Sequence, residues 1–414
     1  MRKLAMLAAA GLALAVGATG CGDSDPDSSG GSAGASRIKL VVASYSDKTQ
    51  PYWQELISGF ERQHAGAKVD LQVIDWNHIT QQVNTMVQTR QLPDILNLNT
   101  FAGFAGNNLL HPAKDVVSPE VLDGFVGTFA DSSEYDGTQY GLPFIASARA
   151  LFYNKDIFAK VGIAAPPTTW DELLAAAKKA TAAGYVGYGL PLGAEEAQAE
   201  WSMWMWGNGG DWKSGEEWSI NSPQNVQTLE YLKRLATVEK VTAPNPGRLN
   251  RTDGVWQQFA QGRVAMCMGM PGTLAGMIEK AGNKVKYGVA SVPVNAGKPP
   301  VTLGVQDFLM AFKKPGNQAT VRDFLDYFYQ PDNYVKFLTR EGFLPTTKAG
   351  SEALAKDPKL SPFIEMLDEA RFYPSEDPDW PKVQGAVQNQ LGTALDPNAS
   401  PQQVLDRIQQ VAAG

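Results

Sequence analysis

From residue 37 onward, short apolar runs of strand type alternate with amphipathic stretches of helix type. This alternation constrains the fold most, because it is typical of a mostly parallel sheet covered by helices on both faces. In such sheets, ligands bind outside the carboxyl ends of the strands. The sequence therefore predicts an α/β fold that begins with strands at 38–44, 68–74 and 94–98 and helices at 52–64 and 77–90.

The rest of the chain continues this pattern without an internal repeat, which argues against a solenoid. A length of 414 residues, 43% of them hydrophobic, suits a folded chain of two or three domains, or of two lobes. Further strands are expected at 150–154, 186–192, 264–270, 286–292 and 305–312, and further helices at 169–183, 223–238, 317–329, 331–340, 380–393 and 401–412.

The composition excludes several classes of function. The chain has 36 Lys and Arg against 43 Asp and Glu and no long basic run, which argues against nucleic-acid binding. It has three histidines, and it contains no phosphate loop, HExxH zinc helix, GxGxxG motif after a strand or CxxC pair. We therefore expect neither a cofactor nor a metal site.

Two carboxylate doublets, Glu195-Glu196 and Glu216-Glu217, could in principle serve glycoside hydrolysis, which uses two acids at a set separation. Neighbouring residues on a helix point about 100° apart, so neither doublet forms such a pair by itself. We expect both doublets to be solvated charges, and we expect no enzymatic activity. Cys267 lies in the apolar run VAMCMGM, which predicts a buried side chain and no disulfide.

The N-terminus has the pattern of a secretory signal, because Arg2 and Lys3 precede an uncharged apolar run that is shorter than the ~20 residues needed to span a bilayer. Small residues then end directly before Cys21. Residues 1–20 resemble a bacterial lipoprotein signal peptide, although Ala18 stands where leucine is usual; an ordinary signal peptide is the alternative.

This resemblance implies that Cys21 carries lipid and anchors the protein to the outer face of the cell membrane. The residues that follow are mainly Gly, Ser, Ala and Asp. Such a composition predicts a flexible tether over residues 21–37.

Tryptophans are concentrated in one segment: five of the ten lie between Trp201 and Trp218. On a helix, Trp201 and Trp204 share a face and Trp206 points away, so at least one indole is expected to leave the core. An aromatic face flanked by polar groups matches a pyranose, which has a flat patch of C–H groups and a rim of hydroxyls. Simple filling of a core is the alternative for each tryptophan.

Seven motifs follow one another along the chain: YGLPF at 140–144, LFYNKDIFAKVGI at 151–163, PPTTWDELLAAAKK at 166–179, FAQGRVAM at 259–266, GVQDFLMAFKK at 304–314, EGFLPTT at 341–347 and the tail from WPKVQ at residue 380. In this order they resemble the extracellular solute-binding proteins of carbohydrate ABC importers, the group that includes maltodextrin-binding protein. The resemblance covers residues 38–412.

The resemblance implies a two-lobed periplasmic-binding-protein fold of type II, with hinged lobes that close over a ligand in the cleft between them. The first lobe would contain residues 38–144 and 305–344, and the second residues 145–304 and 345–414. The chain would thus pass between the lobes near Pro143, Gly304 and Pro345.

The resemblance also implies ligand-binding residues at matching positions. The loops after the first three strands would supply Tyr45, Ser46, Asp47, Asp75, Trp76, Asn99, Thr100 and Phe101, and the remaining contacts would come from Ser147, Arg149, Trp201, Gly272, Gln306, Arg371 and Trp380. Two departures favour a saccharide other than maltodextrin: Pro271 stands where a sugar-stacking Trp is common, and Ser147 aligns with an acidic contact.

The sequence thus predicts a monomeric, extracytoplasmic substrate-binding lipoprotein that delivers a sugar to the transmembrane subunits of an ABC permease. One alternative is the same fold with another solute, such as glycerol phosphate, a polyol or a polyamine. A phosphate ligand would need at least two basic groups in the cleft, for which Arg149, Arg371 and Lys48 are the candidates. The other alternative is a lipid-anchored secreted glycosidase.

Overall fold

The structure, a computed structural model, describes residues 36–414. The predicted signal peptide, Cys21 and the predicted tether up to residue 35 lie outside these residues. Ser36 and Arg37, expected to end the tether, instead begin strand β1 (Ser36–Ser44). They pair in register with Ala67 and Lys68 of strand β2 (Ala67–Asp75), so the folded part begins slightly earlier than predicted.

The first sheet has six strands in the order β14-β13-β3-β1-β2, with β6 also paired to β13. Strand β1 is parallel to β2 and to β3 (Ile95–Leu98). Strand β13 (Thr302–Ala311) is antiparallel to both β3 and β6 (Leu142–Ala148), and parallel to β14 (Ala370–Arg371). The sheet is therefore mixed, because a strand from late in the chain joins the three parallel strands that the sequence predicts.

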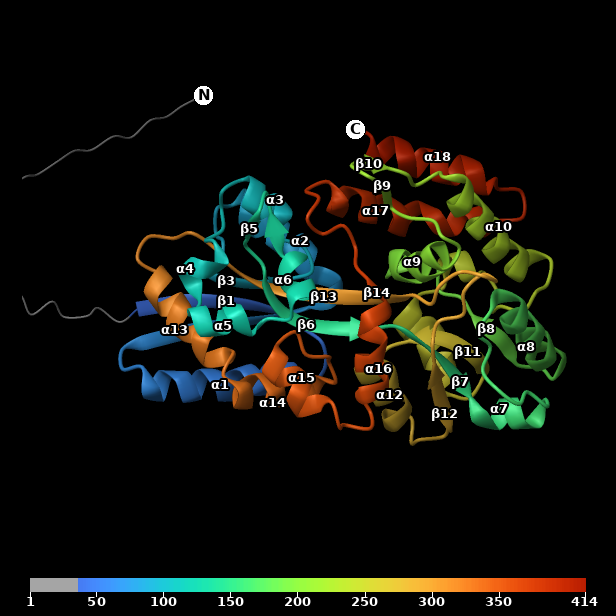
Figure 1. The fold of residues 1–414 in the computed structure, drawn as a ribbon, viewed down its shortest axis with the longest axis horizontal. Coiled ribbons are helices and arrows are strands. Elements are labelled where there is room, and N and C mark those ends of the chain that lie inside the picture. The colour runs from blue at the N-terminus through green and yellow to red at the C-terminus, as the bar shows by residue number, and fades with distance from the viewer. Residues whose placement is uncertain (1–35) are drawn as a thin grey trace, which may run out of the picture. The chain divides into compact units, whose positions relative to one another are not determined.

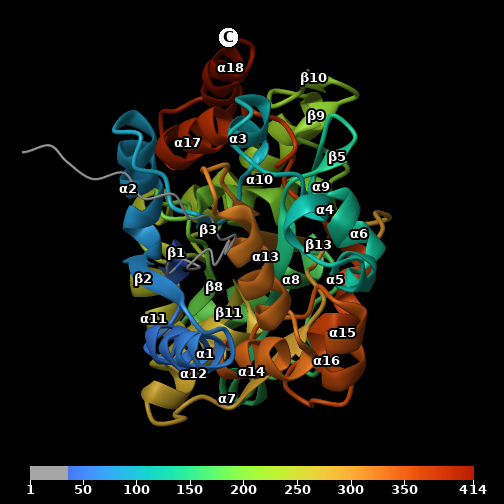
Figure 2. The same ribbon diagram turned by 90° about the vertical axis from the view of Figure 1, so that its left-hand side faces the viewer.

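Alternate residues of β1 enter two different cores. Ile38, Leu40 and Val42 pack into one core with α1 (Thr49–Gln63), α13 (Gln318–Phe328) and α14 (Pro331–Glu341). Val41 and Ala43 pack into another with α2 (Trp76–Gln88) and α3 (Ala102–Gly106). Figures 1 and 2 both show α1 and α14 below the strands and α2 and α3 above them. We call this sheet with its helices the first lobe.

The second sheet has four strands in the order β12-β7-β11-β8, and it lies to the right of the first in Figure 1. The strands are β7 (Ala150–Asn154), β8 (Val186–Gly189), β11 (Val264–Gly269) and β12 (Tyr287–Ala290). A further core joins this sheet to the helices α8 (Trp170–Ala182), α9 (Ala197–Gly207), α10 (Pro223–Thr237), α17 (Trp380–Gln390) and α18 (Pro401–Ala412). We call this part the second lobe.

Most of these elements lie where the sequence predicts them, but the expected set lacks strand β6 and the helices α9 and α12 (Pro271–Lys280). It also lacks shorter elements: α3, α4 (Ala113–Val116), α5 (Pro119–Gly124), α6 (Gly127–Asp131), α7 (Lys155–Lys160), α11 (Gln257–Ala260), α15 (Lys348–Leu354), α16 (Ser361–Glu365), a π-helical turn (Arg251–Trp256), and the two-residue strands β4 (Glu134–Tyr135), β5 (Thr138–Gln139), β9 (Lys213–Ser214), β10 (Glu217–Trp218) and β14. None of the helices within residues 36–414 is both long and apolar enough to cross a membrane.

The two lobes are joined most directly at Arg149. This residue lies between β6, which ends at Ala148 in the first sheet, and β7, which begins at Ala150 in the second. Its backbone N–H donates to the carbonyl of Leu303 on β13 at 3.1 Å, so two connecting strands are fastened together at this point. A charged side chain is thereby held at the junction of the lobes.

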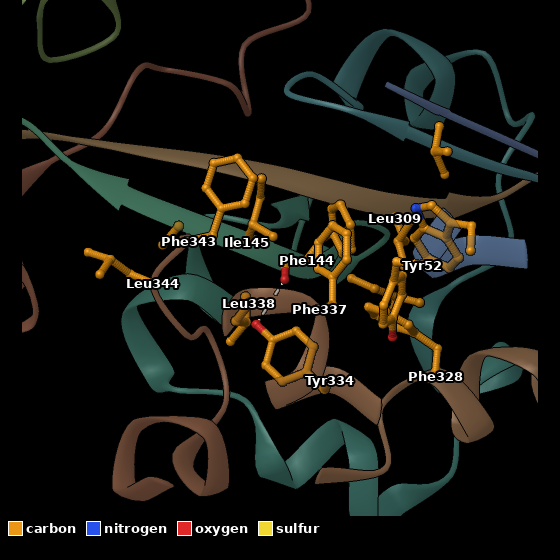
Figure 3. Close-up of a cluster of buried hydrophobic side chains, with 14 of the residues drawn as sticks. Tyr52, Phe144, Ile145, Leu309, Phe328, Tyr334, Phe337, Leu338, Phe343 and Leu344 are labelled. Atoms are coloured by element: carbon orange, nitrogen blue, oxygen red, sulfur yellow. Dashed lines mark hydrogen bonds between the residues drawn. The ribbon is translucent and has the colours of Figure 1, made fainter. Parts of the chain in front are cut away.

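Two buried tyrosines of the first lobe hold the strand that enters this junction. The Tyr329 hydroxyl donates to the carbonyl of Pro143 at 3.0 Å, and the Tyr334 hydroxyl donates to that of Phe144 at 2.8 Å. Figure 3 shows the second of these bonds beside the stacked rings of Phe144 and Phe337. The beginning of β6, at the opposite end of the strand from Arg149, is thus fixed to α14 and its neighbourhood.

The segment that follows α14 keeps its contacts with elements of the first lobe. Thr347 forms a β-bridge with Phe125, and the Lys348 ammonium donates to the carbonyl of Asp123 at 2.8 Å, both within the first lobe. Helix α15 also packs beside α14. The chain therefore stays with the first lobe through α15 and reaches the second lobe by way of β14.

Candidate functional site

A pocket of about 570 Å³ lies where the carboxyl ends of β1 and β2 face the second lobe. This volume is in the range typical of small-molecule sites, ~300–1,000 Å³. Ser44 and Tyr45 line it at the end of β1, and Asp75, Trp76 and Asn77 line it at the end of β2. The location agrees with the rule that α/β sheets bind ligands at the carboxyl ends of their strands.

One wall of the pocket is aromatic. The ring of Tyr45 lies 5.9 Å from that of Trp76 and 4.8 Å from that of Phe343, measured between ring centroids. All three residues line the pocket, and Tyr45 and Trp76 are partly exposed. Rings of this kind offer flat apolar faces with polar groups at the rim.

The floor of the pocket is built by the connecting strands β6 and β13. Successive residues of a strand point to opposite faces, so Val305 and Asp307 line the pocket while Gln306 does not. Asp307 is 2% exposed and accepts a hydrogen bond from the Tyr45 hydroxyl. Burial raises the pKa of Asp307 to about 6, and burial also raises the pKa of Tyr45 well above its usual value.

The opposite wall, on the second lobe, is formed by two arginines and two glutamates. A guanidinium nitrogen of Arg149 lies 3.0 Å from a carboxylate oxygen of Glu196. The guanidinium of Arg251 contacts Glu196 as well, and it lies 3.3 Å from Glu195. We call these four residues the charge tetrad.

The π-helical turn at Arg251–Trp256 positions one side of this tetrad. The Arg251 guanidinium lies 4.4 Å from the centroid of the Trp256 ring, a cation–π contact. Thr252 donates its backbone N–H to Glu195 at 2.9 Å, and its hydroxyl bonds to the same carboxylate. π-Helical turns are rare and are frequent at functional sites.

This chemistry suits binding rather than bond cleavage. Glu195 and Glu196, the doublet considered for glycoside hydrolysis, both pair with guanidinium groups. Among residues 36–414, no group of three or more His, Cys, Asp or Glu side chains is arranged to hold a metal ion. The pocket therefore offers hydrogen-bond donors, acceptors and aromatic faces.

The structure brings five of the sequence-predicted residues together in this pocket: Tyr45, Asp75, Trp76, Ser147 and Arg149. Asp75 also caps α2 by accepting the backbone N–H of Asn77 at 2.9 Å. The loops after the first two strands and the junction between the lobes thus contribute side chains to one cavity.

Other predicted residues from the strand loops lie outside the pocket. Asp47 is exposed and pairs with Lys280 at 3.3 Å, and the neighbouring Ser46 is at the surface of the same loop. Phe101 is fully buried in the core above the first sheet, next to the partly buried Asn99 and Thr100. The loop after β3 packs against β13 through the Phe101–Phe308 contact.

Two predicted residues make structural contacts near the pocket. The Gln306 side chain accepts from the Ser132 hydroxyl at 2.6 Å and donates to the carbonyl of Phe129 at 3.0 Å, on the face of β13 away from the cavity. Gly272 packs so closely on the turn at residues 341–342 that a Cβ would lie 2.4 Å from the carbonyl oxygen of Glu341.

The tryptophan prediction needs correction. Trp201, Trp204 and Trp206 are at most 4% exposed, so none of these indoles leaves the core. Every residue of α9 is buried, because the helix is covered on all sides within the second lobe. Trp380 is also fully buried, between Trp212 and Tyr373, and Arg371 lies over the Trp206 ring and pairs with Asp211, outside the pocket.

Several pocket residues were missed by sequence reasoning: Glu195, Glu196, Arg251, Asp307 and Phe343. The doublet Glu195-Glu196 was noticed but expected to be solvated, whereas each carboxylate side chain is only 12% exposed. Asp307 lies inside a strand-like run next to Gln306. Because side chains alternate between the two faces of a strand, the face assigned to each residue of β13 was the signal that could have identified Asp307. Arg251 had no local signal in the sequence.

Comparison with known proteins gives three informative matches. The family of bacterial extracellular solute-binding proteins matches residues 44–335. A binding protein of Brucella abortus is 31% identical over 382 residues, covering 90% of this chain and 92% of that protein. The sn-glycerol-3-phosphate-binding periplasmic protein of the same species is 29% identical over 311 residues, covering 68% of this chain and 69% of that protein.

Among solved structures, a solute-binding protein of an ABC transporter from Thermotoga lettingae, bound with α-D-tagatose, superposes with a TM-score of 0.80. It is 24% identical and covers 91% of this chain and 100% of its own. This likeness confirms the two-lobed α/β fold that the sequence predicts.

Proposed function

The chain belongs to the bacterial extracellular solute-binding proteins, and from this premise we propose that it is the substrate-binding lipoprotein of an ABC importer and binds a sugar between its lobes. Members of this family bind solutes and act outside the cytoplasm, and they are not enzymes. The sugar would then be delivered to a membrane permease, which is a separate protein.

One observation carries the proposal: an aromatic wall on the first lobe faces a polar, internally neutralised wall on the second lobe across one cavity. The apolar face of a pyranose would stack on Trp76 and Tyr45. Its hydroxyls would bond to Asp307, Ser147 and the charge tetrad, because carboxylates accept and guanidinium groups donate. Contacts to both walls at once would favour the closed arrangement of the lobes.

The lobes of the proposed receptor would hinge about Arg149 and the strand β13. The first lobe would comprise the elements around β1, β2 and β3 together with α13, α14 and α15. The second lobe would comprise β7 through β12 and, after β14, α17 and α18. Lipid on Cys21 would keep the receptor, acting as a monomer, close to its permease.

The second candidate ligand is a phosphate-bearing solute such as sn-glycerol 3-phosphate. Two observations favour it: a relative carries that ligand in its name, and two arginines line the pocket. The pairing of both arginines with glutamates argues for the neutral sugar, because a phosphate would have to displace carboxylates that already occupy the guanidinium groups.

A ligand screen tests the proposal. Mono-, di- and oligosaccharides, polyols and sn-glycerol 3-phosphate would be compared by the shift that each causes in the melting temperature, since a ligand that binds only the native form raises it. We expect a sugar to give the largest shift and titration calorimetry to give a Kd in the micromolar range, about −8 kcal/mol. Binding of no sugar, or cleavage of oligosaccharides in the panel, would refute the proposal.

A further inference from the structure

The two arginines of the charge tetrad have no basic neighbours in the pocket. Among the described residues 36–414, the basic residues that line the cavity are Arg149 and Arg251. Five carboxylates also line it: Asp75, Glu195, Glu196, Asp253 and Asp307. Any attraction of an anionic ligand would therefore depend on these two guanidinium groups alone. Their availability is set by the residues that they already contact.

Both guanidinium groups are held by Glu196. Arg149, which is 3% exposed, lies 3.0 Å from this carboxylate, and Arg251 contacts it from the other side. Glu195 then faces Arg251 at 3.3 Å. Two negative charges thus compensate two positive charges within one partly buried cluster, where screening by solvent is weak.

The backbone around the glutamates keeps them in this position. The segment that carries them packs directly on the segment that carries Arg251: Gly193 N–H donates to the carbonyl of Leu249 at 3.0 Å, and a Cβ at Gly193 would lie 2.6 Å from the Asn250 side chain. Thr252 binds Glu195 through its backbone N–H. The carboxylates are therefore ordered before a ligand arrives. This lowers the entropic cost of forming their ion pairs with the arginines.

A third glutamate lies behind the tetrad but does not neutralise it in the same way. Glu200 is 3% exposed and accepts hydrogen bonds from the Tyr188 hydroxyl and, at 2.8 Å, from the indole of Trp204. These partners belong to the core of the second lobe. Glu195 and Glu196 are the two carboxylates that pair directly with the arginines at the cavity wall.

We propose that Glu195 and Glu196 are specificity-determining residues, which neutralise Arg149 and Arg251 and so make the pocket select uncharged ligands and exclude phosphate-bearing ones. This inference rests on the proposed function, because it names the charge class of the solute bound at the same site. It also explains how a pocket with two arginines can serve a neutral ligand. Repulsion of the wrong ligand is a common route to specificity.

Removal of one glutamate charge tests the inference. The Glu196→Gln variant leaves one positive charge uncompensated, so it should bind sn-glycerol 3-phosphate at least about tenfold more tightly than the parent does, because hydrogen bonds between guanidinium and phosphate are strong. Glycerol, which has the same carbon skeleton without charge, should bind both proteins equally weakly. The gain should decrease at high salt. Titration calorimetry with both compounds measures these affinities.

A charge-balanced variant provides the matched control. Glu196→Gln combined with Arg149→Gln leaves Arg251 paired with Glu195, so the gain in phosphate binding should disappear. The Glu195→Gln variant should give a gain of the same sign if Glu196→Gln does not fold. A folded single variant without the gain would overturn the inference, as would a parent protein that already binds sn-glycerol 3-phosphate over tenfold more tightly than glycerol.

The outcomes of this test can be distinguished from those of the ligand screen. The parent protein's response to the sugar panel tests whether the pocket binds a sugar, and the glycerol 3-phosphate titrations test only what the glutamates do to charge selection. Failure of one can therefore be distinguished from failure of the other.

Discussion

Gly272 and Gly342 meet backbone to backbone where α12 of the second lobe touches the end of α14 in the first. A Cβ on Gly342 would lie 2.5 Å from the Cα of Gly272, and Gly342 adopts a positive φ of 76° at the C-terminus of α14. Real Cβ atoms do not approach so closely. The contact between the lobes on this side of the pocket therefore requires glycine in both chain segments.

Gly272→Ala should push the two lobes apart, because the new Cβ would lie 2.4 Å from the carbonyl oxygen of Glu341. We expect a loss of about 1–3 kcal/mol in the free energy of unfolding, as for other overpacked sites, and weaker sugar binding. Gly276→Ala is the matched control, because it lies in the same helix with nothing within 4 Å of its Cβ position. Equal effects of both variants on sugar affinity, measured by calorimetry, would contradict this role of Gly272.

Trp76→Ala and Trp380→Ala should separate ligand binding from folding. Trp76 is partly exposed in the pocket, so its removal should raise the sugar Kd about tenfold or more with a small change in stability. Trp380 is fully buried, so its removal should lower the free energy of unfolding by about 3–5 kcal/mol. Urea unfolding and calorimetry measure the two effects. Unchanged sugar affinity in Trp76→Ala would refute the aromatic wall as a binding surface.

The fold could be predicted from the sequence wherever hydrophobic periodicity was strong. Strand β7 has the predicted bounds 150–154, and β1 and β2 differ from prediction by one or two residues at their ends. The order of strands could not be predicted, because the pairing of β13 with β3 and β6 joins segments far apart in the sequence. Short helices such as α4 and α5 have too few turns to show a period.

The site was predicted in part, for a related reason. Residues directly after β1 and β2 were found because the carboxyl ends of parallel strands form one edge. Trp201 and Trp380 were misplaced because the sequence alone does not distinguish a tryptophan in a core from one in a binding wall. Only the tertiary packing of the two side chains shows that they are buried. The pairing of Arg251 with Glu195 and Glu196 depends on a contact between loops that no local pattern encodes.

Asp307→Asn should flatten the dependence of stability on pH. Burial raises the pKa of Asp307 to about 6, above the ~3.9 of an unfolded aspartate, so the native state binds more protons than the unfolded state between these values. Stability contributed by the protonated group is therefore lost as pH rises through about 6. We expect similar free energies of unfolding at pH 4 and a gain of up to ~3 kcal/mol for the variant at pH 7.5. Urea denaturation measures these free energies. The same difference in free energy of unfolding between variant and parent at pH 4 and at pH 7.5 would contradict the raised pKa of Asp307.

Asp47→Asn should leave sugar binding almost unchanged, because the structure places this carboxylate outside the pocket. The Lys280 ammonium on α12 lies 3.3 Å from a carboxylate oxygen of Asp47 in the loop after β1. The side chains of Asp47 and Lys280 are 69% and 68% exposed. Ion pairs with such exposure contribute less than ~1 kcal/mol and weaken with salt. We therefore expect a sugar Kd within about twofold of the parent value and a small, salt-sensitive loss of stability.

Lys280→Gln is the matched control for this variant, since it removes the same ion pair from the other side. The two variants should behave alike in calorimetry and in urea unfolding if the pair is the only role of Asp47. A tenfold weaker sugar affinity in Asp47→Asn but not in Lys280→Gln would instead make Asp47 a ligand contact, as the family resemblance implies. In that case the binding surface would extend beyond the pocket along the loop after β1, toward the rim where the lobes meet.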